Sequence, residues 1–137
     1  MNRIVNITAN DTELSLKTKT RLSAMLEKAG FIVSKEFNHH AELTVCIGGD
    51  GAFLQTMHEH NFPSMPIIGI NTGHLGFFQE ITVDGIDELI RMLAHGDYHI
   101  QENSALSAEI CTESETKQIT AINEIVIRGE GERLMHL

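Results

Sequence analysis

The sequence of 137 residues has no tryptophan, one tyrosine, two prolines and two cysteines, and it has 10 Lys and Arg against 19 Asp and Glu. The cysteines, Cys46 and Cys111, have no partners at metal-ligand spacing, which argues against a zinc module or a disulfide framework. We interpret both as buried, reduced thiols. The net charge of -9 repels polyanions and so argues against nucleic acid and anionic membrane surfaces as partners.

Long apolar runs are also missing. No stretch approaches the roughly 18 apolar residues that a membrane-spanning helix needs, and the start of the chain lacks the basic, apolar and small-residue order of a signal peptide. With 42% hydrophobic residues, the chain can still bury one ordinary core. These features predict a globular, cytoplasmic protein.

Short apolar runs alternate with helical patterns over residues 1–97. The runs at 3–9, 31–35, 43–47 and 66–70 are rich in β-branched residues and are typical of buried strands. Strands that alternate with helices favour an open parallel sheet with right-handed crossovers. We therefore predict a Rossmann-like α/β domain with helices on both faces of the sheet.

Helix ends have their own signals in this region. Asn10 and Glu13 have capping-box spacing, and Gly30 is placed to end the first helix. Asp84 is predicted to cap the third helix and Gly96 to end it. The second helix is expected over residues 52–60, and the core positions are expected to be Leu14, Leu22, Met25, Leu26 and Ala29 in the first helix and Ile86, Leu89, Ile90 and Leu93 in the third.

The pattern changes at residue 98. Residues 98–111 and 117–128 alternate apolar and polar side chains with a polar turn between them, which indicates antiparallel strands. Two or three strands are too few to form an independent sheet. We expect residues 98–137 to be the beginning of a truncated, β-rich second domain.

A glycine loop directly follows the third predicted strand. Gly48, Gly49 and Gly51 lack the side chains that would keep a phosphate chain away from the backbone. The carboxylate of Asp50 needs another purpose there, either binding Mg²⁺ or accepting a proton from an attacking hydroxyl. A plain tight turn held by an Asx-type hydrogen bond is the alternative. The flanking strand and helix favour a ligand site, because ligands collect at the carboxyl ends of parallel strands.

The loop resembles the GGDG motif of a kinase superfamily that includes NAD kinases, diacylglycerol and sphingosine kinases and 6-phosphofructokinases. Residues 71–78 (NTGHLGFF) are similar to the NxGxLGF motif of NAD kinases, and residues 121–125 (AINEI) resemble that family's asparagine–glutamate motif. The three motifs span nearly the whole chain in the expected order. The family's later nucleotide-binding segments have no counterpart before Leu137, so the resemblance predicts part of a longer enzyme.

The resemblance implies that Asp50 contacts or activates the ribose 2′-hydroxyl of NAD, which attacks the γ-phosphate of ATP to give NADP, with Mg²⁺ accompanying ATP. Phe77 would pack near the adenosine, Asn123 would bond the purine edge, and Glu124 would accept from ribose hydroxyls. A homodimer or homotetramer is also implied. The residues expected to bind nucleotide are Gly48, Gly49, Gly51, Asn71, Gly73, Leu75, Gly76, Phe77, Asn123 and Glu124.

Departures and alternatives remain. Ala52 replaces the threonine that the family usually has after GGDG, which removes one hydroxyl from the phosphate loop. A lipid kinase of the diacylglycerol type shares the GGDG loop but gains nothing from the other two motifs. A non-catalytic nucleotide-binding fragment is a further alternative. His58 and His60, two residues apart on a helix, point in different directions, so we expect solvated side chains rather than metal ligands.

Overall fold

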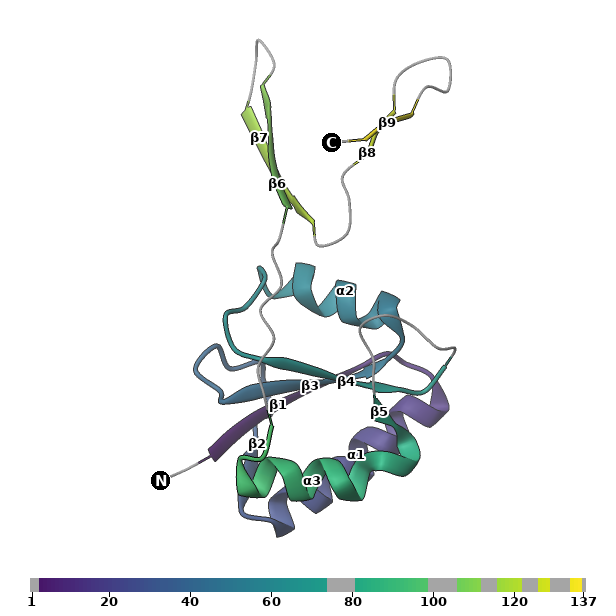
Figure 1. The fold of residues 1–137 in the computed structure, drawn as a ribbon, viewed down its shortest axis with the longest axis vertical. Coiled ribbons are helices and arrows are strands. Elements are labelled where there is room, and N and C mark those ends of the chain that lie inside the picture. The colour runs from purple at the N-terminus through teal and green to yellow at the C-terminus, as the bar shows by residue number, and fades with distance from the viewer. Residues whose placement is uncertain are drawn as a thin grey trace. The chain divides into compact units, whose positions relative to one another are not determined.

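The structure, a computed structural model, divides into two compact units, Met1–Ile100 and Gln101–Leu137 (Figure 1). The first unit contains an α/β sheet, and the second contains short antiparallel strands. The structure describes residues 3–73, 81–98, 106–111, 116–121, 126–128 and 134–136.

A five-stranded parallel sheet in the order β2-β1-β3-β4-β5 forms the centre of the first unit. All four strands predicted from the sequence are present. The fifth, β5, was not predicted because a strand of two residues is too short to show a pattern. The strands are β1 (Arg3–Ala9), β2 (Phe31–Val33), β3 (Leu43–Gly48), β4 (Ile67–Asn71) and β5 (Ile81–Thr82).

Helices cover both faces of the sheet, which confirms the predicted fold class. In Figure 1, α1 and α3 lie on one face and α2 lies on the other. Among the described residues, no helix has the length and apolar content to cross a bilayer. The helices are α1 (Glu13–Lys28), α2 (Asp50–Glu59) and α3 (Ile86–His95), with a 3-10 turn, η1 (Val83–Gly85), before α3.

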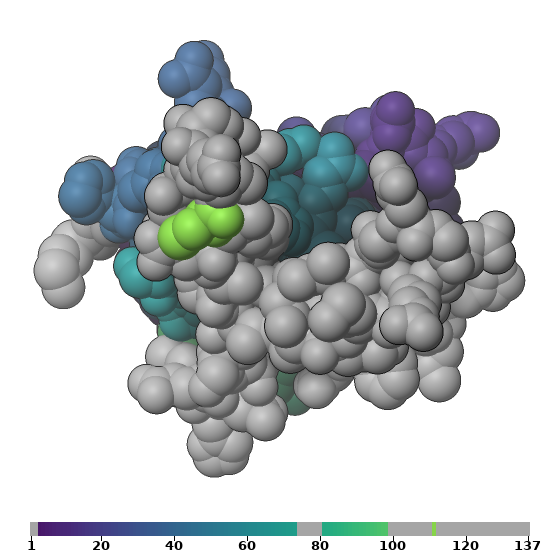
Figure 2. All heavy atoms as spheres, turned by 90° about the horizontal axis from the view of Figure 1, so that it is seen from above, coloured from purple at the N-terminus to yellow at the C-terminus, as the bar shows by residue number. Residues whose placement is uncertain are grey.

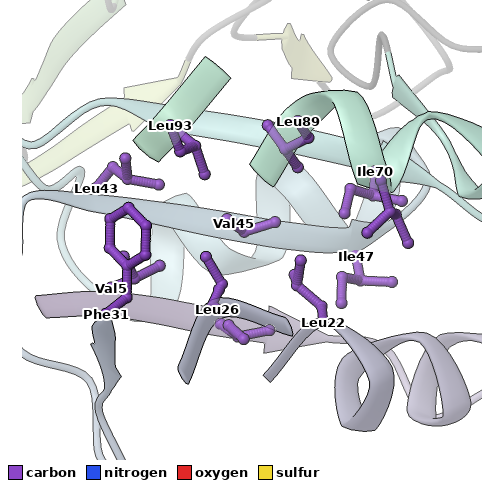
Figure 3. Packing of buried hydrophobic residues seen from close by; sticks show 12 residues of the cluster. Val5, Leu22, Leu26, Phe31, Leu43, Val45, Ile47, Ile70, Leu89 and Leu93 are labelled. Carbon is purple, nitrogen blue, oxygen red and sulfur yellow. The ribbon is translucent and has the colours of Figure 1, made fainter. Parts of the chain in front are cut away.

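The apolar core fills the layer between the sheet and helices α1 and α3 (Figure 3). Alternate residues of β3 contribute Leu43, Val45 and Ile47 to it, as the period of a strand requires. Full burial of each aliphatic side chain stabilises the fold by about 1.5–3 kcal/mol. The cluster consists of Val5, Ile7, Leu22, Leu26, Phe31, Leu43, Val45, Ile47, Ile70, Ile86, Leu89 and Leu93.

The buried residue of α2 is polar and joins the helix to the sheet. Thr56 of α2 is 5% exposed and shares hydrogen bonds with Thr8 Oγ1 at 3.0 Å and Cys46 Sγ at 3.5 Å. Asn6 Nδ2 donates to Thr44 Oγ1 at 3.2 Å on the neighbouring strand. Strand β3 is thus buried throughout, as predicted, but one of its faces packs in the apolar core and the other makes hydrogen bonds with polar side chains.

Helix α1 begins two residues later than predicted. Thr12, not Asn10, is the N-cap, and its Oγ1 accepts a hydrogen bond from Ser15 N at 3.2 Å. Asn10 N instead donates to Ile47 O at 3.1 Å, which extends the contact between β1 and β3. The expected core position Leu14 is therefore wrong, because Leu14 is 47% exposed and Ser15 takes the inward position with no exposed surface. The expected core position Ala29 is also wrong, because Ala29 is the exposed C-cap of α1.

Of the other three predicted helix ends, two are confirmed and one is wrong. Gly30 and Gly96 follow the last turns of α1 and α3 with φ angles of +96° and +67°, as predicted from their lack of a side chain. Asp84 is not the cap of α3. It lies inside η1, and Gly85 is the N-cap without a side-chain hydrogen bond.

Within its described strands, the second unit contains two antiparallel pairs. Strand β6 (Leu106–Cys111) pairs with β7 (Thr116–Ala121), and β8 (Val126–Arg128) pairs with β9 (Leu134–His136). The predicted antiparallel pairing is confirmed, whereas the prediction that Cys111 is buried was wrong. Cys111 is exposed at the last position of β6, while Cys46 is buried in β3.

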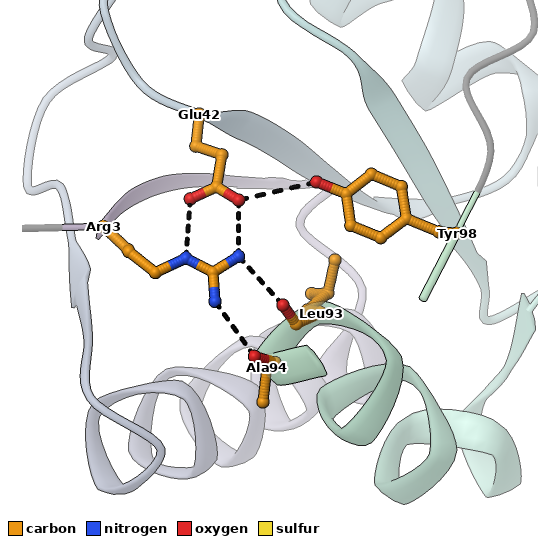
Figure 4. A network of polar contacts seen from close by, with 5 residues as sticks. All are labelled: Arg3, Glu42, Leu93, Ala94 and Tyr98. Carbon is orange, nitrogen blue, oxygen red and sulfur yellow. Dashed lines mark hydrogen bonds and ion pairs between the residues drawn. The ribbon is translucent and has the colours of Figure 1, made fainter. Parts of the chain in front are cut away.

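An arginine joins the start of β1 to the end of α3 (Figure 4). Arg3 Nε and Nη2 donate to the carboxylate of Glu42 at 2.9 and 2.6 Å, and Nη2 and Nη1 also donate to the carbonyl oxygens of Leu93 at 2.9 Å and Ala94 at 3.2 Å. Tyr98 Oη donates to Glu42 Oε1 at 3.5 Å. The hydrogen bond with Arg3 lowers the pKa of Glu42 and raises that of Arg3.

Candidate functional site

The order of the sheet reverses between β1 and β3. The chain leaves β1 through α1 toward β2 and leaves β3 through α2 toward β4, with the two helices on opposite faces (Figure 1). In open α/β sheets, ligands bind beyond the carboxyl ends of the strands at such a reversal, because the loops diverge there. The predicted glycine loop, residues 48–51, follows β3 at this position.

Gly48 is required by its backbone and by its neighbours. Its φ angle is +148°, and a Cβ atom at this position would lie 2.6 Å from Ala52 Cβ and 3.0 Å from Asn10 Nδ2. An added Cβ at Gly49 or Gly51 would meet no atom within 4 Å. Gly48 thus lets β3 end in close contact with the segment after β1, while the open space at the other two glycines would admit a ligand.

Asp50 occupies the first position of α2, directly after the N-cap Gly49. Its side chain is half-buried, so part of the residue remains at the surface. The first N–H groups of a helix lack partners within the helix and carry partial positive charge, which favours carboxylates and phosphates nearby. A carboxylate and a helix N-terminus of the kind that suits phosphate therefore lie within one turn of chain.

The second predicted glycine loop starts beside the first. Gly48 and Asn71 are paired across β3 and β4, and Thr72 N donates to Gly48 O at 3.1 Å. Gly73 N donates to Asn71 Oδ1 at 2.8 Å, which turns the chain directly after β4. The two glycine loops therefore leave the sheet at one edge, as the proposed site requires.

A third segment, after β1, reaches the same place and was missed as part of the site. Thr12 Oγ1 lies 3.2 Å from Asn10 Oδ1 and 2.9 Å from Ser15 Oγ, which in turn lies 2.6 Å from Thr72 Oγ1. In Figure 2, purple atoms from the start of the chain reach the surface near teal atoms from its middle. The available signal was position, because this segment follows a buried strand just as the glycine loops do.

Five of the residues predicted to bind nucleotide lie outside the described residues and stay predictions. Three belong to the second glycine loop and two to the segment before β8. They are Leu75, Gly76, Phe77, Asn123 and Glu124.

The paired histidines of α2 contact aromatic rings. His58 is exposed, as expected, and meets Phe62 edge-on at 4.9 Å between ring centroids. His60 is half-buried and stacks on Phe37 at 3.7 Å, so the expectation of a fully solvated side chain was wrong for this residue. The apolar face of an imidazole ring packs on a phenyl ring.

Asp50 is the candidate metal ligand in the first glycine loop. In the part of the chain that the structure describes, no group of three or more His, Cys, Asp and Glu side chains could hold a metal ion. Mg²⁺ in ATP-dependent enzymes commonly uses one or two carboxylates and completes its shell with phosphate oxygens and water. Asp50 fits that kind of site, with the remaining ligands supplied by a bound nucleotide.

Known proteins resemble this chain both in sequence and in fold. An NAD kinase of Finegoldia magna is 39% identical over 98% of this chain and 50% of its own length. Yeast NADH kinase, solved with NADH, matches 91% of this chain and 48% of its own with a TM-score of 0.74 at 15% identity. An Archaeoglobus fulgidus NAD kinase, solved with ATP, matches 93% of this chain and 49% of its own with a TM-score of 0.64 at 19% identity.

The chain spans about half the length of each of these three relatives. At such low identity the two solved structures establish the fold, and the sequence carries the family assignment. The family profile described as ATP-NAD kinase N-terminal domain matches residues 6–98, which include both glycine loops and most of the α/β unit. The chain therefore belongs to the ATP-NAD kinase family.

Proposed function

We propose that the whole protein is an NAD kinase, which transfers the γ-phosphate of ATP to the 2′-hydroxyl of the adenosine ribose of NAD. The observation that carries the proposal is the position of Asp50 in the first turn of α2, where the sheet order reverses, in a chain of this family. The solved relatives that contain NADH and ATP support the two substrates.

Asp50 accepts the proton of the ribose 2′-hydroxyl while the ribose 2′-oxygen forms a bond to the γ-phosphorus. The bond between that phosphorus and the β,γ-bridging oxygen breaks, and ADP leaves. The N–H groups at the start of α2 and the open space at Gly49 and Gly51 suit a phosphate chain. Positioning and charge stabilisation supply most of the catalysis in phosphoryl transfer. Bound Mg²⁺ would neutralise phosphate charge, with Asp50 as its protein ligand or neighbour.

The remaining contacts concern the nucleotide beyond its phosphates. We assign Leu75, Gly76 and Phe77 to the adenosine part of NAD, and Asn123 and Glu124 to its purine edge and ribose hydroxyls. The ring of Phe77 suits stacking, and the side chains of Asn123 and Glu124 suit hydrogen bonds. Asn71, at the start of the same loop, is paired with Gly48, and Gly73 N donates to Asn71 Oδ1, which supports this assignment.

We further propose a cytoplasmic homodimer or homotetramer that binds neither nucleic acid nor membrane. The net charge of -9 supports the absence of polyanionic partners. Light scattering coupled to gel filtration measures the subunit number, and a monomeric result removes this part of the proposal.

The deciding experiment replaces Asp50 by asparagine in the protein expressed from its complete gene. Asp50→Asn keeps the size of the side chain but removes the proton acceptor, so we expect NADP formation to fall by about 10²- to 10⁴-fold. Glu59→Gln makes the same change at the exposed last residue of α2 and should leave the rate unchanged.

Urea unfolding of both variants separates lost chemistry from lost fold. Full activity in a folded Asp50→Asn protein would remove Asp50 from its role. Diacylglycerol, offered as acceptor in place of NAD, tests the alternative function, and preferential lipid phosphorylation would establish it.

A further inference from the structure

A buried serine in α1 has its hydroxyl partners outside the helix backbone. Ser15 has no exposed surface, and its Oγ lies 2.9 Å from Thr12 Oγ1 and 2.6 Å from Thr72 Oγ1, 57 residues away in sequence. Other hydroxyls of the same helix bond within it: Thr20 donates to Leu16 O at 3.1 Å, and Ser23 donates to Lys19 O at 2.8 Å. Ser15 differs from them by joining α1 to the loop after β4.

The hydroxyl groups of Thr12, Ser15 and Thr72 can form one continuous chain of hydrogen bonds. Each hydroxyl has one proton to donate. Thr12 Oγ1 accepts from Ser15 N as the N-cap, and its proton can serve Ser15 Oγ at 2.9 Å or Asn10 Oδ1 at 3.2 Å. When Thr12 donates to Ser15, the Ser15 proton is available to Thr72 Oγ1, and either of these two hydroxyls can be the donor in their bond. The helix cap thereby extends through Ser15 to the second glycine loop.

Thr72 is held on two sides. Its backbone N donates to Gly48 O at 3.1 Å on β3, and its hydroxyl bonds to Ser15 of α1. The next residue, Gly73, donates to Asn71 Oδ1 at 2.8 Å. The start of the second loop is thus fixed by β3, by its own turn and by α1. The tie to α1 is made by the buried side chain of Ser15.

We propose that Ser15 is a positioning residue for NAD binding. Ser15 acts through Thr72 on the loop that begins at Asn71. The inference rests on the proposed function, in which that loop binds the adenosine part of NAD. Because Ser15 is fully buried, it does not touch substrate itself. Without its hydroxyl, Thr72 keeps the backbone bond to Gly48 but loses the side-chain tie, and the loop samples more arrangements before NAD binds.

The effect is selective for one substrate. Residues 48–51, assigned to the phosphates, are held by β3 and by the first turn of α2, and their bond to Thr72 runs from its backbone N–H to Gly48 O, which the Ser15 hydroxyl does not supply. Loss of the tie therefore weakens NAD binding while the KM for ATP stays the same. A general loss of stability would instead lower the amount of active protein without changing either KM.

The kinetic test uses Ser15→Ala and, as its matched control on α1, Ser23→Ala in the protein from the complete gene. Loss of the partly buried hydrogen bond between Ser15 and Thr72 should raise the KM for NAD about threefold to tenfold, with kcat and the KM for ATP within about twofold of the unmodified protein. Ser23→Ala should change none of the three, because its hydroxyl is exposed and bonds only within the helix.

Variants at the partner position test the coupling. Thr72→Val keeps the shape but removes the hydroxyl and should match Ser15→Ala, whereas Thr72→Ser keeps the hydroxyl and should bind NAD normally. The double variant Ser15→Ala with Thr72→Val should bind NAD no more weakly than either single variant, because the bond between Ser15 and Thr72 is lost in all three. Additive losses would overturn the proposed path through Thr72. Thr72→Val also serves if Ser15→Ala does not fold.

Amide hydrogen exchange at Thr72 and Gly73 provides a readout without catalysis. Exchange at both positions should be faster in Ser15→Ala than in the unmodified protein and unchanged in Ser23→Ala. If NADP forms but Ser15→Ala alters neither exchange nor the KM for NAD, this inference is overturned and the proposed function stands. If no NADP forms, the proposed function falls and takes the NAD assignment with it, while faster exchange would still establish the tie.

Discussion

Gly48 meets two demands at one position, a positive φ angle and close contact with two neighbours. Replacement by alanine strains the backbone and drives the new Cβ toward the Cβ of Ala52, which sits on a helix and has no rotamer to change. We expect Gly48→Ala to lower the free energy of unfolding by about 2–4 kcal/mol, as measured by urea denaturation.

Gly51 provides the contrast to this prediction. An added Cβ there meets nothing within 4 Å, and the residue lies in the first turn of α2, where alanine is the better helix former. Gly51→Ala should therefore leave the stability unchanged or raise it slightly, while any phosphate bound against this backbone would be obstructed. Equal destabilisation by the two variants would contradict the difference in packing.

At this scale the sequence predicted the loops but not the hydroxyl chain. Glycines in a row after an apolar run are a local signal, readable without a fold. Ser15 and Thr72 are 57 residues apart, and nothing in either neighbourhood marks them as partners. The burial of Ser15 became evident only once the first turn of α1 was placed at Thr12 rather than Asn10.

Among the elements, α2 is held to the sheet differently from α1 and α3. Its buried residue is Thr56, which bonds to Thr8 and Cys46, whereas α1 and α3 bury leucines and an isoleucine. The apolar pattern of Phe53, Leu54 and Met57 predicted the helix correctly, yet all three are only half-buried. Periodicity indicates that a helix has a buried side, but it does not reveal the chemistry of the surface opposite.

The contacts of Arg3 join β1 to Glu42, which directly precedes β3, and to the end of α3, and the ion pair with Glu42 makes this association depend on pH. The pKa of Glu42 is lower in the folded protein than in the unfolded chain, so the contact stabilises the fold above the unfolded pKa and is lost as the pH falls through the folded value. We expect Glu42→Gln to reduce the free energy of unfolding at pH 7 by about 0.5–1 kcal/mol, a modest value because both side chains are partly exposed.

The difference between the two proteins should shrink below about pH 4.3, where the unfolded Glu42 begins to bind a proton. Urea unfolding at pH 7 and at pH 3 measures it. Glu88→Gln is the matched control, since Glu88 pairs with Arg91 on the exposed surface of α3 and its pKa is lowered in the same direction. A larger loss in the control than in Glu42→Gln would contradict the role of the Arg3 contact.

At the scale of the molecule, the core residues that the structure describes lie between Val5 and Leu93, inside the first unit. We propose that residues 1–97 are an independent α/β domain. Residues 1–100, produced alone, should unfold in one cooperative transition in urea, followed by circular dichroism. Residues 101–137 alone should show none, because two-stranded sheets are marginal in water. A gradual transition for residues 1–100 would contradict the proposed domain.

The parallel sheet and its helices were predicted from the alternation of strand and helix patterns, and the three motifs that resemble those of NAD kinases were enough to indicate the family. The strand order was not available from these patterns, because a run such as 43–47 shows that a strand is buried but not which strands lie beside it. That order is what places Asp50 at the reversal point of the sheet.

The bonds from Arg3 to the carbonyl oxygens of Leu93 and Ala94 bring the first strand and the last helix of the α/β unit together. Both ends of the unit therefore emerge at one place, which is the geometry that tolerates circular permutation. A gene rearranged to begin in the connection between β2 and β3, with the old ends fused by a brief linker, would preserve every strand neighbour and every residue around Asp50.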